Sequence, residues 1–541
     1  MSHQPTHRAA VILLCLALGG CLQSEDTPFL QPDWEQALRE ADRDEDATQQ
    51  PTSIRNEEQT RLTATSLLRD DGVLGLSIEH AAMLALSGNR DLAVQQFQPV
   101  IVGANERIER GVFDPEFFAS ADFSEERASE VNRATGTRFN VEGEDTTAQA
   151  GIRQTLPTGT DIELDASFDR EVSNRTPKQQ ETRIGLTVTQ QLLRDAGPAV
   201  NLARIRQARI DTRASVFELR GYAETLLAEV ESAYWRYVLA RERIAIFQRS
   251  VDVARQQRDE VEQRIEVGVL AETLGAAARA EVALRELALI DARSDLKRQR
   301  LQLLRLINPD VESPLAPSLD LMTSPVTTPE PIDDLPDRIE LAEFRRPDLA
   351  EAKLRLEQGR LETLITRNGV LPRLEVFIAL GKSGFGDTAS DSVRQLDEDS
   401  YDLGFGISLS QSLGNDAAIG RRNAAYATRR QSAAAVENLR QLIRLDVLIA
   451  ANEVERSREQ IDATTTARQL QEDTVRAEVE RFEAGASTAL LVAQAQRDLI
   501  QAQVAEVEAV VAYRLAIIQL YLAEGSLLDR RGYALDTDQT L

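Results

Sequence analysis

The chain has 541 residues, of which 42% are hydrophobic and only 5% aromatic, and its formal net charge at pH 7 is −26. An excess of acid this large argues against a general nucleic-acid binder, which needs basic surface to neutralise phosphates. After position 21 no cysteine remains and His80 is the only histidine, which excludes Cys/His zinc sites and thiol nucleophiles. We predict no catalytic residue, metal or cofactor; an enzyme that uses scattered carboxylates stays open as an alternative.

The N-terminal residues have the pattern of a targeting signal. Arg8 precedes an apolar run over 9–18, which is too short to span a bilayer and fits the core of a signal peptide, 1–20. The segment 18–21 (LGGC) resembles a bacterial lipobox, in which Cys21 would be cleaved, acylated with palmitate-like chains and so anchored. The alternative is an ordinary secretory signal with a chance cysteine. Residues 21–75 are polar and acidic and are expected to form a tether.

The next segment, 76–308, combines a helix, a β patch and a helical hairpin. A helix is expected over 91–110, with Pro99 either kinking it or setting its true start. Between 113 and 190 the apolar period is two, and the turn at 157–160 (PTGT) predicts an additional hairpin over 150–169. This first patch is therefore predicted to supply four strands. The following helices, 198–266 and onward to 307, reverse at Gly268 and span roughly 100 Å.

Residues 309–337 are proline-rich and are predicted to form an extended connector. The segment 338–527 then returns to the same order of elements. A helix is expected over 348–367, a β patch of two strands over 370–411, and helices over 423–483 and 488–523 that reverse at Gly485. A short tail, 528–541, ends the chain.

Two motif pairs show that these segments are repeats. Residues 89–93 (NRDLA) return as 346–350 (RPDLA), and at the same shift Pro115 falls on Pro372. Residues 264–268 (RIEVG) return as 481–485 (RFEAG). Long units used twice in one chain indicate internal pseudo-symmetry. Because helices this long cannot bury their apolar stripes alone, they need partners along their whole length.

Together these features resemble the TolC-like outer-membrane efflux family, in its lipoprotein branch. The most specific motifs are 346–349 (RPDL), 371–372 (LP) and 481–488 (RFEAGAST), followed by Leu491 and 495–499 (AQRDL). The resemblance implies an α+β fold: a trimeric outer-membrane β-barrel continued by a long periplasmic α-helical barrel, with two internal repeats per chain. It implies a Gram-negative outer membrane, lipid anchoring and extension into the periplasm.

The resemblance also implies sites and partners. The turns would dock a periplasmic adaptor protein of an inner-membrane pump, and plain helix reversal is the alternative role for both glycines. These tip residues are Gly268, Val269, Leu270, Gly485, Ala486, Ser487 and Thr488. Many family members carry acidic residues after the second tip glycine, where this chain has Leu491 and Gln494. Three copies of Leu491 would form an apolar constriction; packing within the coiled coil is the alternative.

The function implied is a passive exit duct of a tripartite efflux or type I secretion system, in contact with outer-membrane lipid and with no nucleic acid. The main alternative is a structural coiled-coil lipoprotein of the periplasm without a pore. That alternative explains the helices and the lipobox but leaves the alternating strands in both repeats unexplained.

Overall fold

The computed structural model describes residues 54–56, 67–69, 72–131, 134–174, 178–311, 313–323, 329, 331–332 and 334–535. The predicted signal peptide, Cys21 and most of the predicted tether lie outside these residues. The described helices are α4 (Ile78–Gly88), α5 (Arg90–Gln95), α6 (Gln98–Gly111), α7 (Pro198–Asn201), α8 (Ala203–Glu266), α9 (Thr273–Ile307), α10 (Leu335–Arg345), α11 (Pro347–Asn368), α12 (Ala389–Arg394), α13 (Asp416–Glu483), α14 (Ala489–Glu524) and α15 (Leu527–Arg530).

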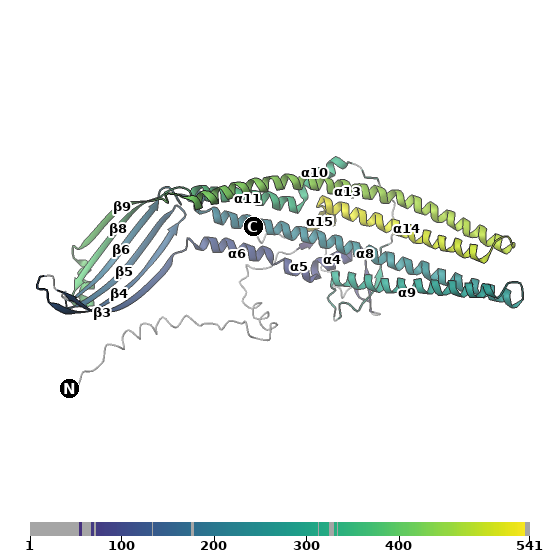
Figure 1. Ribbon diagram of the computed structural model, residues 1–541, viewed down its shortest axis with the longest axis horizontal. Coiled ribbons are helices and arrows are strands. Elements are labelled where there is room, and N and C mark those ends of the chain that lie inside the picture. Colours follow the sequence, from purple (N-terminus) through teal and green to yellow (C-terminus); the bar gives the residue numbers. More distant parts are fainter. Residues whose placement is uncertain are drawn as a thin grey trace, which may run out of the picture. The chain divides into compact units, whose positions relative to one another are not determined.

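A six-stranded antiparallel sheet adjoins one end of the long helices, with strand order β3-β4-β5-β6-β8-β9 (Figure 1). Its strands are β3 (Glu116–Val131), β4 (Arg138–Leu156), β5 (Thr160–Ser173), β6 (Gln179–Gln191), β8 (Arg373–Gly386) and β9 (Tyr401–Ser410). Four strands come from the first repeat and two from the second, which confirms the predicted division. Both repeats therefore contribute to one continuous sheet, joined where β6 pairs with β8.

The additional hairpin predicted over 150–169 is part of this sheet: β4 and β5 lie between β3 and β6. Its turn is fixed to the start of α7. The Asn201 amide donates to the Pro157 carbonyl at 3.0 Å, and the Gly197 N–H donates to the Thr158 carbonyl at 3.0 Å. Gly159, at φ +81°, lies so close to the Asp195 carbonyl that a Cβ would meet it at 2.4 Å. The hairpin is thus held at its helix-side end as well as along both strands.

One face of the sheet is apolar and exposed. Alternating residues on β9, including Phe405 at 84% and Ile407 at 68%, leave large side chains open to the surroundings. The opposite face carries mainly small and polar residues, together with Phe118 and Phe377, whose rings lie over Gly151 and Gly406. There Gly185 lies opposite Gly381, and the Arg183 guanidinium crosses to Asp402 at 2.9 Å. The alternation places lipid-compatible and water-compatible residues on opposite sides of each strand.

The helices form a layer that continues from the sheet. Helix α6 packs on α8, α11 packs between α8 and α13, and two antiparallel pairs, α8 with α9 and α13 with α14, extend away from the sheet (Figure 1). Pro99 lies at the first turn of α6, so it sets the start of that helix rather than kinking a longer one. Along α8, a buried line that we call the helical seam follows three- and four-residue spacing through Leu227, Val230, Tyr234 and Tyr237.

Two small sheets join distant parts of the chain. Strand β2 (Val73–Leu76) pairs in parallel with β7 (Ser318–Leu321), and β1 (Ile54–Asn56) pairs antiparallel with β10 (Tyr533–Leu535). Tyr234 of α8 donates its hydroxyl to the Leu76 carbonyl at 3.2 Å, and Tyr237 donates to the Leu319 carbonyl at 3.3 Å. Two residues of the helical seam therefore also hold the β2–β7 pair, beside the largest cluster of buried apolar side chains.

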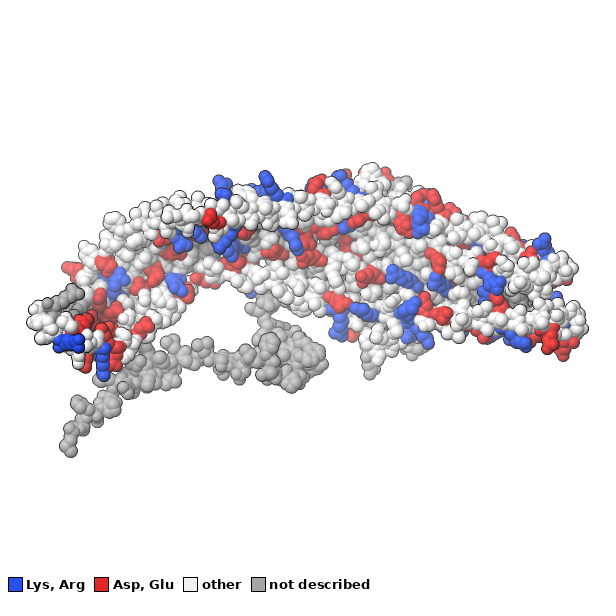
Figure 2. All heavy atoms as spheres, viewed as in Figure 1, with Lys and Arg blue, Asp and Glu red and all other residues white. Residues whose placement is uncertain are grey.

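Charged side chains of both signs are interspersed along the helices on the face that Figure 2 presents. Acidic side chains gather at the end of the sheet farthest from the helices (Figure 2). There Glu125 lies opposite Glu144, and Asp145 lies opposite Glu171. Among the described residues, no helix combines the length and the apolar character needed to cross a membrane.

Candidate functional site at the helical tips

Both helical pairs reverse through the same hydrogen-bonded turn. In the first, the Gly268 N–H donates to the Ile265 carbonyl and the Val269 N–H to the Arg264 carbonyl, both at 2.9 Å. In the second, the Gly485 N–H donates to the Phe482 carbonyl at 3.0 Å and the Ala486 N–H to the Arg481 carbonyl at 2.7 Å. This pair of bonds defines a Schellman motif, which ends a helix with a residue in the left-handed region.

The turn explains the glycine at each tip. Gly268 and Gly485 have φ values of +78° and +76°, which favour glycine because a Cβ strains this backbone region. No atom lies within 4 Å of a Cβ built at either position. The turn geometry alone therefore accounts for both glycines, and both tips present an open backbone surface.

Side-chain hydrogen bonds hold the second tip. Thr488 is the N-cap of α14, and its hydroxyl accepts from the Leu491 N–H at 3.4 Å. Ser487 donates to Glu478 at 2.7 Å, and this bond, together with Arg481, lowers the pKa of the Glu478 carboxyl. The first tip has no side-chain cap at the start of α9, where Val269 is 71% exposed and Leu270 is half-buried. The tip with the side-chain cap, Thr488, is thus also the one that carries the longer tip motif, 481–488.

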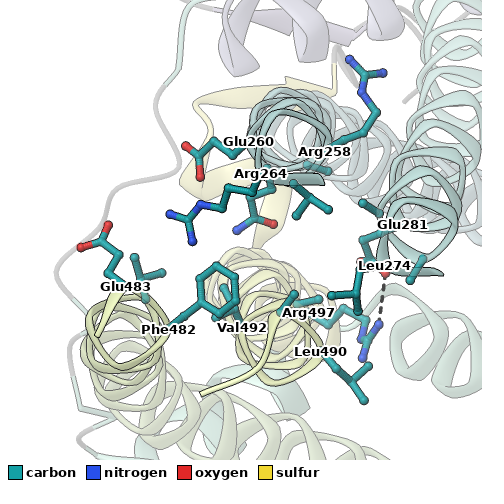
Figure 3. Close-up of a pocket in the computed structure, with 18 residues that line it drawn as sticks. Arg258, Glu260, Arg264, Leu274, Glu281, Phe482, Glu483, Leu490, Val492 and Arg497 are labelled. Atoms are coloured by element: carbon teal, nitrogen blue, oxygen red, sulfur yellow. Dashed lines mark hydrogen bonds and ion pairs between the residues drawn. The ribbon is translucent and has the colours of Figure 1, made fainter. Parts of the chain in front are cut away.

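The two tips lie side by side and share a cleft. Val261 and Leu274 of the first hairpin line it together with Phe482 and Leu490 of the second. Figure 3 shows the Arg264 side chain reaching toward Phe482, and its guanidinium lies 5.3 Å from the ring centroid, within the range of a cation–π contact. The repeated tip motifs thus contact each other through Arg264, the first residue of one copy, and Phe482, the second residue of the other.

A second link crosses between the hairpins farther from the tips. Arg497 of α14 donates to Glu281 of α9 at 3.1 Å (Figure 3). Sequence reasoning missed both links, because neither partner is a neighbour in the chain. The repeated motif could have predicted the first link, because Arg264 and Phe482 belong to its two copies.

The predicted constriction residues lie on the exposed side of α14. Leu491 is 48% exposed and Gln494 is exposed, whereas Val492 and Ala495 are buried in the hairpin. Leu491 therefore does not pack in the seam of its own hairpin, and its place at a constriction stays a prediction. Asp498, one turn beyond Gln494, is exposed on the same side and was not identified from the sequence.

Apolar side chains remain exposed along both lateral borders of the helical layer. Helix α6 exposes a stripe with spacings of three, four and seven residues, and α9 and α13 expose leucines and isoleucines. The members above 40% exposure are Val94 on α5, Phe97 at the N-cap of α6, Ile101 and Ile108 on α6, Val112 at its C-cap, Leu284, Leu287, Ile290 and Leu301 on α9, and Tyr426, Leu442, Leu445, Leu448, Ile449 and Leu470 on α13. The sheet has matching open edges at β3 and β9.

The junction between the repeats contains a buried carboxyl. Glu224 of α8 is 1% exposed and lies 3.5 Å from Arg220, and burial raises its pKa to about 7 against the opposing effect of Arg220. Nearby, Arg346 binds Asp348 at 2.6 Å and approaches Asp446 at 3.4 Å. The repeated RPDL motif thus serves here to tie α11 to α13 and, through Gly221 against Pro347, to α8.

The described part of the chain combines long helices, which end in two exposed tips, with a sheet that is apolar and exposed on one face. The family model for outer membrane efflux proteins matches residues 82–309 and 339–526, that is, most of both repeats. The chain belongs to the outer membrane efflux protein family, and its place is the outer membrane. A search of curated proteins found no match.

Solved structures show the same fold. The outer-membrane channel OprN is 18% identical with a TM-score of 0.63, covering 89% of this chain and 96% of that one. The CmeC outer membrane channel of Campylobacter jejuni is 16% identical with a TM-score of 0.62, covering 83% and 85%. The outer membrane protein VceC of Vibrio cholerae is 16% identical with a TM-score of 0.60, covering 83% and 96%. Each is similar to this chain in fold.

Proposed function

We propose that three copies of this chain close into an exit duct that crosses the outer membrane and extends into the periplasm. The observation that carries this proposal is the sheet, which is apolar and exposed on one face and unpaired at both edges. Unpaired strand edges and exposed apolar faces are normally covered by another chain or by lipid. Because β3 runs away from the helices and β9 runs back toward them, β9 of one copy can pair antiparallel with β3 of the next. The apolar stripes on α6, α9 and α13 suit the same head-to-tail closure.

The proposed barrel is wide. Three copies of a six-stranded sheet give 18 strands, and barrels of about 16–18 strands leave an aqueous channel. Its polar face would line the channel, and its apolar face would meet lipid. The acidic residues at the far ends of β3, β4 and β5 would then surround the outer mouth and favour cations over anions.

The duct is passive in this proposal. An inner-membrane pump supplies the energy, a periplasmic adaptor docks at the tips around Gly268 and Gly485, and the chain catalyses no reaction. Support comes from the exposed tip backbone and from the cleft that the two tips share. Leu491 and Gln494 form the periplasmic constriction, supported by their exposure on one side of α14. Cys21 carries the lipid anchor, supported by the LGGC segment alone.

Conductance in a planar bilayer tests the duct. Purified oligomers inserted from detergent should open discrete, stepwise ion currents, because an 18-stranded barrel holds a continuous water column. Denatured protein at the same concentration is the control. Folded trimers that insert but conduct no current would contradict the proposal and favour the structural lipoprotein without a pore.

A further inference from the structure

An arginine-lined groove lies on the helices next to the sheet. It runs between α8, α11 and α13 and is lined by Arg206, Arg209, Arg213, Arg360, Arg367 and Arg429. A second groove between α6 and α8 shares Arg209 and Arg213 and adds Arg107 and Arg110. Because the two grooves share residues, they form one continuous basic surface, which we name the arginine groove.

Most of these arginines have no acidic partner among the described residues. In the lining of the arginine groove the acidic residues are Glu106 and Glu357. Glu106 accepts from Arg110 at 2.6 Å and from Arg209 at 2.7 Å, and Arg209 is the main cause of its lowered pKa. Within the described part of the chain, no ion pair joins the remaining arginines to a carboxylate. Those arginines are Arg107, Arg206, Arg213, Arg360, Arg367 and Arg429.

This gathering of unpaired cations occurs in a chain with 88 acidic and 62 basic residues. Elsewhere on the helices arginines pair with acids three or four positions away, as Arg456 does with Glu453 and Arg468 with Glu472. Like charges held together without counter-charges repel one another. The arginine groove therefore suits an anion that comes from outside the chain.

The groove begins at the sheet-side ends of the helices, which lie next to the membrane surface in the proposed duct. Arg206 is three residues from the start of α8, Arg367 is one residue from the end of α11, and Arg110 is one residue from the end of α6. Arg429, the farthest, is 13 residues from the start of α13. At about 1.5 Å per residue, all of them lie within roughly 20 Å of the helix ends that adjoin the sheet. Lipid headgroups lie just beyond the apolar band of such a sheet.

The groove also opens on the outer side of the proposed duct. Residues spaced by seven keep to one side of a supercoiled helix, and Arg206 and Arg213 lie on the seven-residue series that leads along α8 to Tyr234 and Arg241. Those two residues hold the β2–β7 pair, through the Leu76 and Leu321 carbonyls. A folded lobe inside the pore would block it, so the side of α8 that carries β2 and β7 faces outward. The opposite side of the layer carries Asp211 with Gln358 instead.

We propose that the arginine groove binds the phosphate groups of anionic phospholipids in the periplasmic leaflet of the outer membrane. The inference rests on the proposed duct for its orientation. Guanidinium groups suit this role because each presents several N–H donors in a plane that matches two phosphate oxygens. Their long stems also let the charged ends reach up toward the headgroups. Bound lipid would fill the space between α8, α11 and α13 and fix the helices to the membrane surface.

Lipid retention measured by native mass spectrometry tests the proposal. Full-length trimers are exposed to equal amounts of phosphatidylglycerol and phosphatidylcholine in detergent, and the retained lipids are counted. The natural chain should retain phosphatidylglycerol with a preference of about tenfold or more, and salt should weaken it. The groove variant Arg206→Gln/Arg213→Gln/Arg360→Gln/Arg367→Gln should show no preference. A control with the same charge change far from the groove, Arg279→Gln/Arg298→Gln/Arg456→Gln/Arg476→Gln, should keep it.

Three results would overturn the proposal. One is equal retention of both lipids by the natural chain. Another is the same loss in both variants, which would assign the preference to total charge. The third is displacement of the lipid by inorganic phosphate at about equal concentration, which would assign the site to soluble anions. Planar-bilayer currents from the same preparations separate this proposal from the duct: currents without lipid preference refute only the lipid site, and absent currents refute the duct.

Discussion

At the scale of single residues, Leu491 is the informative position on α14. Its neighbour Val492 is buried in the hairpin, while Leu491 itself is half-exposed beside Gln494 and Asp498. An apolar side chain kept on an exposed helix face needs cover from another copy or a role in a pore. Three such leucines around one axis would narrow the water path and make its wall apolar.

Leu491→Ser should therefore raise the single-channel conductance, because the smaller, polar side chain makes the constriction wider and easier to hydrate. The measurement is current in planar bilayers at matched voltage and salt. Leu470→Ser is the control, since Leu470 is likewise exposed but lies on α13 away from the tips. Unchanged conductance in the Leu491 variant would remove this residue from the constriction.

Glu224 is the residue that should make stability depend on pH. Its pKa is about 7 in the folded chain against a usual 4.5, so between these values the folded state holds a proton that the unfolded state has lost. Its contribution to stability is present below pH 4.5 and is lost as the pH rises through 7.

Glu224→Gln should therefore remove the loss of stability that the natural chain undergoes as the pH rises. Relative to the natural chain, the variant should gain unfolding free energy as the pH rises from 5 to 8, by up to about 3 kcal/mol. Chemical unfolding followed by circular dichroism at several pH values measures the difference. Glu229→Gln, on an exposed position of the same helix, is the control and should show no such trend. A gain for Glu224→Gln that does not change with pH would contradict the assignment.

At the scale of elements, the repeated turn motif produces two equal helix reversals. Gly268 and Gly485 end their helices with the same pair of hydrogen bonds and nearly the same φ. The two hairpins differ at the start of their second helices. Thr488 caps α14, whereas no side-chain cap is present at the start of α9. The second tip should therefore be the less tolerant of change.

Gly485→Pro should abolish adaptor docking while leaving oligomers intact. Proline requires φ near −65°, which this turn cannot provide. It also removes the N–H that donates a hydrogen bond to the Phe482 carbonyl. Site-specific crosslinking from the tip to a periplasmic adaptor measures docking. Gly136→Pro is the matched control, because Gly136 also has positive φ and open space but lies in the β3–β4 loop at the far end of the sheet. Intact assembly with unchanged crosslinking of the Gly485 variant would mean that this tip does not dock.

At the scale of the whole molecule, the hairpin β4–β5 determines the width of the proposed barrel. Its strands are inserted between β3 and β6, and both of those strands have their connected ends at the far end of the sheet. Removing the hairpin would leave β3 and β6 antiparallel and joined by a short loop. The remaining four strands per chain would preserve the topology.

Deletion of residues 134–174 should consequently narrow the barrel by about a third, since barrel diameter grows roughly linearly with strand number. Electron cryomicroscopy of trimers of the deleted and full-length chains measures this diameter. The helical part serves as the internal control and should keep its dimensions. An unchanged barrel diameter would show that β4 and β5 do not share in closing it.

Much of this architecture follows from local patterns. Period-two alternation predicted the strands, including the additional hairpin, because side chains of a strand point alternately to two faces. Proline and glycine predicted the element ends, as at Pro99 and Gly485, because both act on the backbone of their own residue. The short helix α12 inside the second β patch was missed, since a six-residue helix has too little period to detect.

Local patterns in the sequence were enough to predict the repeat, the order of the long helices and of the six strands of the large sheet, the reversals at both tips and the family. Each of these depends on residues close together in the chain or on a motif that occurs twice. The tertiary structure was needed to show that β4 and β5 join the sheet, that Arg264 meets Phe482, that Glu224 is buried near Arg220 and Arg346, and that arginines of four helices line one groove. These contacts join residues that are far apart in the chain, and which sides of the long helices meet depends on how the helices pack against one another.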